Sequence, residues 1–227
     1  MCGRFNVIDN PGLRQLLQDL GIDLSLPQRV NVAPTEKAPL VTGNPAERNL
    51  EWARWWFTPG WAPAVDQKYS MFNARAETLA SSRAFSHAFK CQRGLVPMSS
   101  FIEWRAEEGV KQPWLVSAGG DAALAAAALW DVWEKKGEAP LLSLCIVTTA
   151  AAPEFAPWHS RMPVLLAADE WDQWLDNTRT LASDHRMFRS ELKMPLQLSP
   201  LSRSIGNARH KDAELLAPLG ETVELGA

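Results

Sequence analysis

The chain has 227 residues, of which 46% are hydrophobic and 22% are charged, and its formal net charge is −3. This composition is ordinary for a globular protein that is long enough to bury a core without disulfide or metal staples. The small negative charge excludes a general polyanion-binding surface, so any nucleic-acid site must be a local cluster of cations.

Cysteine spacing and the opening segment exclude several further classes. Cys2, Cys91 and Cys145 stand far apart and form no C-x-x-C pair, so neither a disulfide framework nor a metal site is expected. Arg4 and its polar neighbours exclude a secretory signal, and the longest apolar run, 122–130, is too short to span a bilayer. We expect a cytoplasmic protein with no membrane contact and no cofactor.

The first half of the chain predicts two helices and four strands. Pro11 begins an amphipathic helix that ends at Gly21, because leucines recur between them at helical spacing. Ser81 or Ser82 would cap a second helix that continues through Lys90. Short apolar runs bounded by proline, glycine or asparagine predict strands at 29–33, 39–42, 50–57 and 94–105.

The second half predicts more strands and two helices. Asp169 would cap a helix in which Trp171 and Trp174 share one face, and 183–192 has a less regular helical pattern. The strands are expected at 113–117, 124–133, 141–149, 163–167 and 196–200.

Helices are few and do not alternate regularly with strands, which disfavours a doubly wound parallel sheet. We expect an α+β fold: a single domain with a mixed curved or barrel-like β-sheet core flanked by a few short helices. No repeat or linker divides the chain, so we expect one domain at 1–220 followed by a tail at 221–227.

Cysteine is the second residue, so removal of Met1 would leave an α-amine and a thiol on adjacent carbons. An aldehyde condenses with such an amine to an imine, and the sulfur then closes a five-membered thiazolidine ring. Ordinary pKa values are near 8 for the amine and about 8.5 for the thiol, so modest help from neighbours would make both reactive. A buried cysteine could not react in this way. If Met1 remains, Cys2 is expected only to pack.

Three other segments carry suitable polar groups. Asn73 could orient an amine and Arg75 could bind phosphate, although the alternative is a loop held by an Arg75–Glu77 surface pair. Glu103 interrupts an apolar strand-like run; if its face of the strand is buried, its pKa rises and it can transfer protons. If that face is exposed, it is an ordinary polar pair with Arg105.

His159 is the best acid–base candidate among four histidines, because the other three lie in helix-like or tail segments. A structural role for this histidine is the alternative. Histidine spacing typical of metal sites is absent from the sequence.

Five short blocks together resemble the SRAP family, the SOS response-associated peptidases, and they occur in family order. They are Met1-Cys2-Gly3-Arg4-Phe5, Asn31-Val32-Ala33-Pro34-Thr35, Asn73-Ala74-Arg75-Ala76-Glu77-Thr78, Leu95-Val96-Pro97 leading into Glu103-Trp104, and His159-Ser160-Arg161-Met162-Pro163.

The resemblance implies a sensor of abasic sites in single-stranded DNA that forms a thiazolidine crosslink through processed Cys2 and shields the lesion during the DNA-damage (SOS) response. It implies that Asn73 holds Cys2, that Glu103 manages protons and that His159 assists opening of the deoxyribose ring. It further implies a monomer, cytoplasmic and nucleoid-associated when bound to DNA. The residues implied to contact DNA are Arg4, Arg75, Arg83, Trp104 and Arg161.

Other activities of an N-terminal cysteine remain open. Glutamine amidotransferases also begin Met-Cys-Gly, but they usually have isoleucine at the fourth position and a large synthase domain. A peptidase that uses Cys2 with His159 or Glu103 is a further alternative, although removal of Met1 does not require intrinsic proteolysis. A binding module without covalent chemistry is the non-enzymatic alternative.

Overall fold

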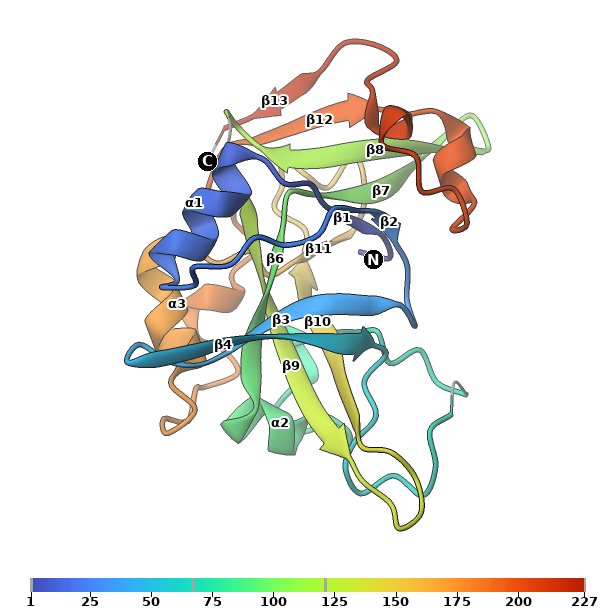
Figure 1. Cartoon of the computed structure of the whole chain (residues 1–227). Helices are drawn as coiled ribbons and strands as arrows, with labels where there is room; N and C mark the ends of the chain where they lie inside the picture. Colours follow the sequence, from blue (N-terminus) through green and yellow to red (C-terminus); the bar gives the residue numbers. More distant parts are fainter. Residues whose placement is uncertain (1, 67, 121, 227) are drawn as a thin grey trace.

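The computed structural model describes residues 2–66, 68–120 and 122–226, which form two β-sheets and three α-helices (Figure 1). The helices are α1 (Pro11–Asp19), α2 (Ser86–Cys91) and α3 (Ala168–Leu175). The strands are β1 (Phe5–Val7), β2 (Arg29–Val32), β3 (Lys37–Asn44), β4 (Glu47–Trp55), β5 (Asn73–Arg75), β6 (Arg93–Met98), β7 (Ser100–Glu107), β8 (Val110–Ala118), β9 (Leu124–Trp133), β10 (Leu141–Ala150), β11 (Arg161–Pro163), β12 (Leu196–Pro200) and β13 (Val223–Leu225). The expected α+β class with a curved sheet core is confirmed.

The first sheet has the strand order β13-β12-β8-β7-β1-β2 and is antiparallel throughout. The amino-terminal strand β1 is therefore an interior strand, between β7 and β2. The residues that lead into β1 therefore enter the sheet between β7 and β2, away from its edge strands.

The second sheet has the order β11-β10-β4-β3-β6-β9, and β9 also pairs with β10, so the sheet curls into a ring (Figure 1). The ring is not a continuous barrel, because β3 meets β6 through one pair, Val41 with Leu95, and β4 meets β10 through two. The core fills the space inside the ring and between the sheets, where buried apolar residues drawn from Cys2 to Leu198 form one large cluster.

Strand β10 organises the second sheet. It pairs antiparallel with β9 and β11 and parallel with β4 and β5. Residues 146–148 lie beside Asn73–Arg75, and residues 148–150 lie beside β11. Two segments that are far apart in sequence, 73–75 and 161–163, are thus brought to the same end of one strand.

The helix predictions were accurate for α1 and partly wrong elsewhere. Asn10 caps α1 by accepting a hydrogen bond from Leu13 N at 2.8 Å. Residues 83–85 form turns instead of the expected helical start, so α2 begins only at Ser86. Asp169 lies inside the first turn of α3, whose Glu170 accepts from the backbone N of the cap residue Ala167.

The expected fourth helix at 183–192 is wrong, because only a 3-10 turn at Arg186–Phe188 forms there. His185 caps this turn, and Met187 and Phe188 are both buried. Burial of two consecutive residues suits a tight turn over the core better than a longer amphipathic helix.

Most strand predictions are confirmed, with two corrections. The single expected run 94–105 is two strands, β6 and β7, which belong to different sheets and separate at Ser99. The strand expected at 163–167 begins earlier, as β11, and only Leu165 beyond it forms a bridge, to Ala126. Strands β1, β5 and β13 were not expected; β13 lies in the segment expected as a tail and pairs with β12.

In the part of the chain that the structure describes, no helix combines the length and the apolar character needed to cross a bilayer.

Candidate functional site

The register between β1 and β7 places Glu103 next to the amino-terminal segment. Phe5 lies opposite Phe101, and Ile102 N donates to Arg4 O at 2.9 Å. Because the strands are antiparallel, continuing this register brings Glu103 level with Gly3. Glu103 is close enough to Cys2 for its charge to contribute to the raised pKa of the Cys2 thiol.

Glu103 is buried, with 1% of its surface exposed. Burial raises the pKa of its carboxyl to about 7, and the positive charge at the amino terminus acts against this rise. Of the two alternatives that the sequence left open, the buried face is the one observed. A carboxyl with this pKa can both take up and release a proton near neutral pH.

Cys2 is also buried, with none of its surface exposed, and it belongs to the main core cluster. Burial, with a smaller contribution from the Glu103 carboxylate, raises the pKa of the Cys2 thiol well above its usual range. Burial and the Glu103 carboxylate thus act against ionisation of the thiol. A protonated thiol at neutral pH needs a base at the moment when its sulfur reacts.

Asn73 contacts the same residue from the other sheet. Its Nδ2 donates to the carbonyl oxygen of Cys2 at 2.9 Å, and strand β5 holds it against β10. Its Oδ1 is buried and accepts no hydrogen bond from the other described residues. An acceptor in this position beside Cys2 suits an N–H donor.

His159 precedes β11 and is half-buried. Its Nδ1 lies 2.9 Å from the backbone N of Arg161, so the start of β11 fixes the orientation of the ring. Burial lowers the pKa of His159, and the positive charges at the amino terminus and on Arg161 act in the same direction. Its neutral form is thereby favoured at neutral pH.

The Arg161 side chain is bound on two sides. Its guanidinium pairs with the carboxylate of Glu77, with Nη1 2.5 Å from Oε1, and Nη2 donates to Thr148 O at 2.7 Å. A surface pair between Arg75 and Glu77 was one alternative from the sequence. It is wrong, because Glu77 pairs with Arg161 instead. Arg75 is exposed at the end of β5.

Arg4 and Trp104 lie together beside the Cys2 segment. The Arg4 guanidinium is 5.8 Å from the centre of the Trp104 ring and donates to Gly3 O at 3.0 Å. Burial lowers the pKa of Arg4, and the carboxylate of Glu36 opposes this shift, which places Glu36 in the same neighbourhood. Arg83 is exposed elsewhere, 4.8 Å from the ring of Trp61.

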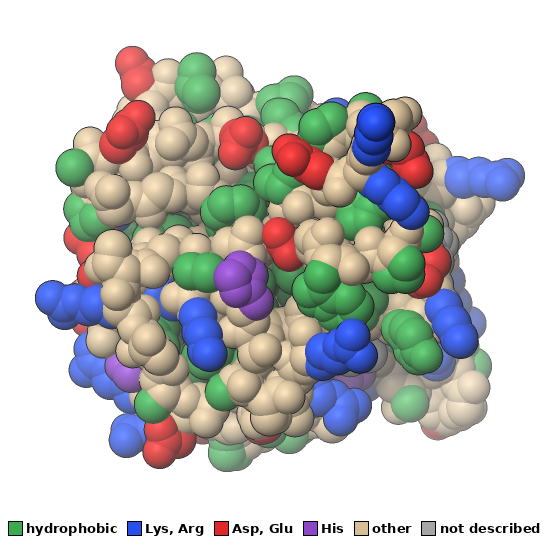
Figure 2. Space-filling model, turned by 90° about the horizontal axis from the view of Figure 1, so that it is seen from below, with side chains coloured by type: hydrophobic (Ala, Val, Ile, Leu, Met, Phe, Trp, Pro, Cys, Tyr) green, Lys and Arg blue, Asp and Glu red, His purple; other side chains and the backbone are tan. Residues whose placement is uncertain are grey.

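The molecular surface carries both charge signs. Figure 2 shows Lys and Arg side chains spread over one face, with acidic and hydrophobic side chains between them. This mixture agrees with the net charge of −3. Recognition of a polyanion must therefore depend on individually placed cations.

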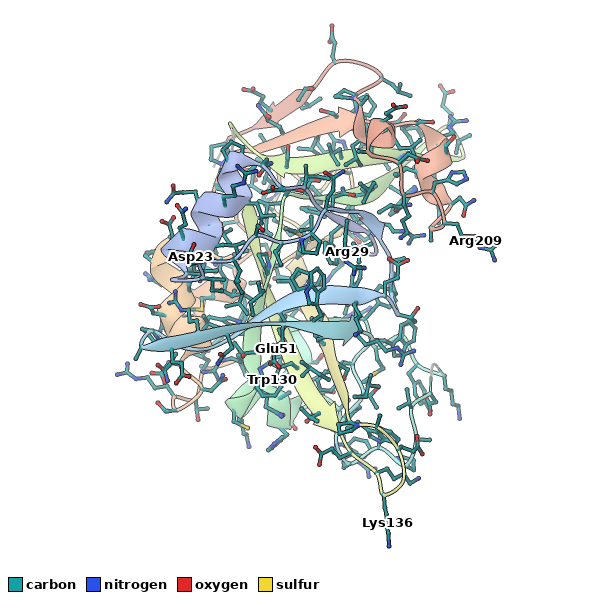
Figure 3. The ribbon with its side chains drawn as sticks, in the orientation of Figure 1. Asp23, Arg29, Glu51, Trp130, Lys136 and Arg209 are labelled. Atoms are coloured by element: carbon teal, nitrogen blue, oxygen red, sulfur yellow. The ribbon has the colours of Figure 1, made fainter. Side chains whose placement is uncertain are left out.

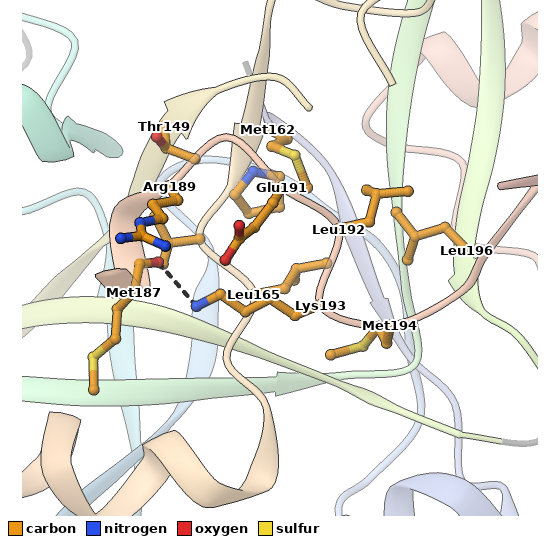
Figure 4. Close-up of a pocket in the computed structure, with 12 residues that line it drawn as sticks. Thr149, Met162, Leu165, Met187, Arg189, Glu191, Leu192, Lys193, Met194 and Leu196 are labelled. Atoms are coloured by element: carbon orange, nitrogen blue, oxygen red, sulfur yellow. Dashed lines mark hydrogen bonds between the residues drawn. The ribbon is translucent and has the colours of Figure 1, made fainter. Parts of the chain in front are cut away.

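A small cavity lies behind the site (Figure 4). Met162 and Thr149 line it and alternate along their strands with Arg161 and Thr148, so they point to the opposite face. Its volume of about 10 Å³ is the space of roughly one water molecule. This cavity is too small for a substrate.

No cluster of three or more metal-ligating side chains occurs within 2–66, 68–120 and 122–226.

The structure brings Cys2, Asn73, Glu103, His159 and Arg161 into one region and leaves Arg83 beside Trp61, on a separate loop. Sequence reasoning gave no role to Thr148, which holds Arg161, or to Asn31. Asn31 Nδ2 donates to three carbonyls, those of Ile205, Asn207 and His210, at 3.0–3.1 Å. Asn31 lies in one of the five motif blocks, and Thr148 lies in the buried run of β10. These positions are the features of the sequence that could have pointed to a role for the two residues.

Comparison with known proteins assigns the chain to a family. Residues 1–208 match the profile of the family described as SOS response associated peptidase (SRAP). The chain is 30% identical to the abasic site processing protein YedK of Escherichia coli over 228 residues, covering 96% of this chain and 100% of that protein. It is 29% identical to the abasic site processing protein YoaM of Bacillus subtilis over 227 residues, covering 95% and 97%.

Solved structures share the fold. A crystal structure of a protein from Bacteroides thetaiotaomicron superposes with a TM-score of 0.75 at 17% identity, covering 94% of this chain and 98% of that chain. One from Bordetella bronchiseptica gives 0.69 at 21% identity, covering 88% and 100%. With the profile match across almost the whole chain, these comparisons show that the protein belongs to the SRAP family.

Proposed function

We propose that this protein, once Met1 has been removed, captures abasic sites in single-stranded DNA by forming a thiazolidine between Cys2 and the sugar aldehyde. The observation that carries the proposal is the placement of Cys2 between the Asn73 amide and a buried Glu103 carboxyl whose pKa is about 7. Relatives that are named abasic site processing proteins support the choice of substrate.

The first step needs an oriented, unprotonated amine. Asn73 anchors the Cys2 carbonyl, and its Oδ1 accepts a hydrogen bond from the Cys2 amine once that amine exists. The amine nitrogen adds to the aldehyde carbon and gives a carbinolamine. Loss of its hydroxyl as water, with a proton supplied by Glu103, then gives the protonated imine.

Glu103 moves the protons in both steps. Its protonated form donates to the departing hydroxyl of the carbinolamine, and its carboxylate then takes the proton from the Cys2 thiol. The sulfur adds to the carbon of the protonated imine, whose nitrogen keeps its proton as the ring amine, and Glu103 is left protonated, as it began. One water is lost overall, and no redox change occurs.

Ring opening of the sugar falls to His159. The cyclic abasic sugar is a hemiacetal, and it reveals its aldehyde when the C1 hydroxyl loses its proton, the bond from C1 to the ring oxygen breaks and that oxygen takes up a proton. A histidine held mainly neutral by burial is suited to take the proton of the C1 hydroxyl.

Removal of Met1 also bears on access to Cys2. Cys2 is fully buried in the chain that still carries residue 1. Cleavage creates the reactive amine, and the thiol must become accessible at this stage for the sugar to reach it. The exposed Arg75 and the Arg4–Trp104 pair contact the strand around the lesion, and Arg161 and Arg83 provide further cations.

The thiol chemistry disfavours the hydrolase alternative. A cysteine peptidase or amidotransferase needs a thiolate, whose population grows when the pKa is lowered. Burial raises the pKa of the Cys2 thiol instead. Ring closure onto an imine tolerates a raised thiol pKa, because the base has to remove the thiol proton only at the moment when the sulfur bonds to the imine carbon.

The decisive experiment compares Cys2→Ala and Cys2→Ser with Cys91→Ala, which removes an exposed thiol. Each purified protein is incubated with an abasic oligonucleotide, and denaturing gels and mass spectrometry locate the adduct. Cys91→Ala should keep the heat-stable adduct, and Cys2→Ala should lose it. Cys2→Ser, which keeps the amine, should be trapped only after borohydride reduction. A full yield of adduct with Cys2→Ala would refute the proposal.

A further inference from the structure

A groove with a volume of about 750 Å³ opens where β2 meets the start of β3. Residues 27–30, Val32, 35–37 and Lys211 line it. Val30 and Val32 are buried and provide an apolar floor, and the charged side chains stand at the walls. This combination suits a ligand with apolar and anionic parts.

Cations outnumber anions along the groove. Arg29 and Lys37 are exposed, and Lys211 is partly exposed and paired with Glu36 at 2.7 Å. The groove therefore carries three positive charges and one negative charge, a local positive excess in a chain whose net charge is −3. The Arg29 guanidinium stacks 4.6 Å from the centre of the Trp52 ring, which holds it in place.

A fourth cation borders this set. Lys37 lies directly opposite Arg54 in the β3–β4 ladder, so their side chains leave the same face of the sheet. Like charges that oppose each other in a ladder are destabilising. A bound anion would relieve the repulsion between Lys37 and Arg54. Anion binding therefore explains why two cations stand opposite each other here, which folding alone does not.

The groove is linked to the Cys2 segment through Glu36 and Arg4. Glu36 lies in its wall and acts electrostatically on Arg4, which contacts Gly3 O. Lys211 donates both to Glu36 and to Asn31 O at 2.8 Å. A chain of direct contacts and charges thus leads from the reacting residue to the cations of the groove.

The bend between β2 and β3 is strained where it borders the groove. Thr35 has a φ of 80°, which is costly for a β-branched residue. Hydrogen bonds from Thr35 N to Trp55 O and from Trp55 N to Glu36 O, at 2.9 and 2.8 Å, hold this conformation. Such strain is typical of functional loops and sets the direction of Glu36 and Lys37.

We propose that this groove binds the undamaged part of the DNA strand on one side of the abasic nucleotide, with Arg29, Lys37 and Lys211 contacting its phosphates. The inference rests on the proposed function. The occupant is a phosphodiester chain, because a single strand supplies anions at regular spacing and sugars for the apolar floor. The groove therefore gives affinity for strand on one flank, while the chemistry stays at Cys2.

The test uses Arg29→Gln/Lys37→Gln, with Lys90→Gln/Lys136→Gln as a control that removes the same charge from exposed positions elsewhere. Figure 3 shows Lys136 at the far end of the molecule from Arg29. Three abasic substrates are compared: one with a single nucleotide on each side, and two with a flank of about ten nucleotides on the 5′ or the 3′ side only. Crosslinking rates are measured against substrate and salt concentration.

The double variant should lose affinity for only one of the long substrates and should match the control on the other long substrate and on the minimal one. On the affected substrate the salt slope should shrink by about 1.4, the value for two lost contacts to a single strand. Equal behaviour of the variant and the control on both long substrates overturns the inference, as does a loss that includes the minimal substrate. If the unmutated protein forms no adduct with any substrate, the proposed function fails and this inference fails with it.

Discussion

The buried carboxyl of Glu103 should make the stability of this protein depend on pH in a characteristic way, and Glu103→Gln tests this. Glutamine keeps the shape of the side chain and cannot ionise. Burial raises the pKa of Glu103 from 4.5 to about 7, so the folded state holds a proton that the unfolded chain releases. The stabilisation that this proton provides is complete below the ordinary pKa and is lost as the pH rises through about 7.

The magnitude follows from the size of the change in pKa. Each tenfold change in an ionisation constant corresponds to about 1.4 kcal/mol, so the free energy of unfolding should fall by about 3 kcal/mol across this interval. The side chain is 1% exposed, so solvent screening reduces this figure little. Glu103→Gln should lack this fall.

Urea unfolding measured from about pH 4.5 to about pH 8 gives the free energy at each pH by linear extrapolation. The difference between the wild type and Glu103→Gln should then grow by about 3 kcal/mol in favour of the variant as the pH rises. Glu138→Gln, which removes an exposed carboxyl, should follow the wild type. Parallel profiles for the wild type and Glu103→Gln would show that the carboxyl titrates normally, and the proton-transfer role would fall.

Three further outcomes are expected. Arg93 is fully buried and donates to five backbone carbonyls, so Arg93→Met should cost about 3–5 kcal/mol of unfolding free energy in urea titrations, whereas the exposed Arg209→Met should change little. Asn31→Asp removes the donors to three carbonyls in 205–211, and amide hydrogen exchange should rise there first; unchanged exchange would contradict the role of Asn31 as a clamp. Arg75→Gln should weaken DNA binding more at low salt than at high salt, and a salt-independent loss would indicate misfolding instead.

Local patterns predicted much of the fold because they report burial directly. The leucines of α1 and the continuous apolar runs of β9 and β10 gave boundaries within a residue or two. The apolar pattern did not show where one run contributes to two sheets. The run from Gly94 to Arg105 predicts one strand, but the chain passes from one sheet to the other at Ser99. The Ser99 side chain donates to Asn6 O instead of continuing a strand ladder.

Strand β5 illustrates a different limit. Within Asn73–Arg75 only Ala74 is buried, so the segment carries no apolar signal of its own. It becomes a strand because β10, which lies more than seventy residues later, offers an unpaired edge in parallel orientation. Such recruitment depends on tertiary structure and leaves no local pattern.

For the candidate site too, the sequence predicts some features, and others depend on tertiary structure. The motif blocks pointed to Cys2, Asn73, Glu103 and His159 as candidates, and the period of the strand allowed a buried Glu103. The partner of Glu77 could not be read from spacing, since Arg161 lies 84 residues away and a nearer arginine, Arg75, was the obvious choice. The direction of the pKa of the Cys2 thiol also depended on packing, because burial outweighs every neighbouring charge.

The interior position of β1 has a practical consequence for anyone who labels or immobilises this protein. Cys2 is enclosed and β1 is hydrogen-bonded on both sides, so an affinity tag or fluorescent protein fused ahead of Cys2 would compete with native packing. The opposite end is permissive, because β13 is an edge strand and Glu224 is exposed. Fusions and surface attachment should therefore be made after β13.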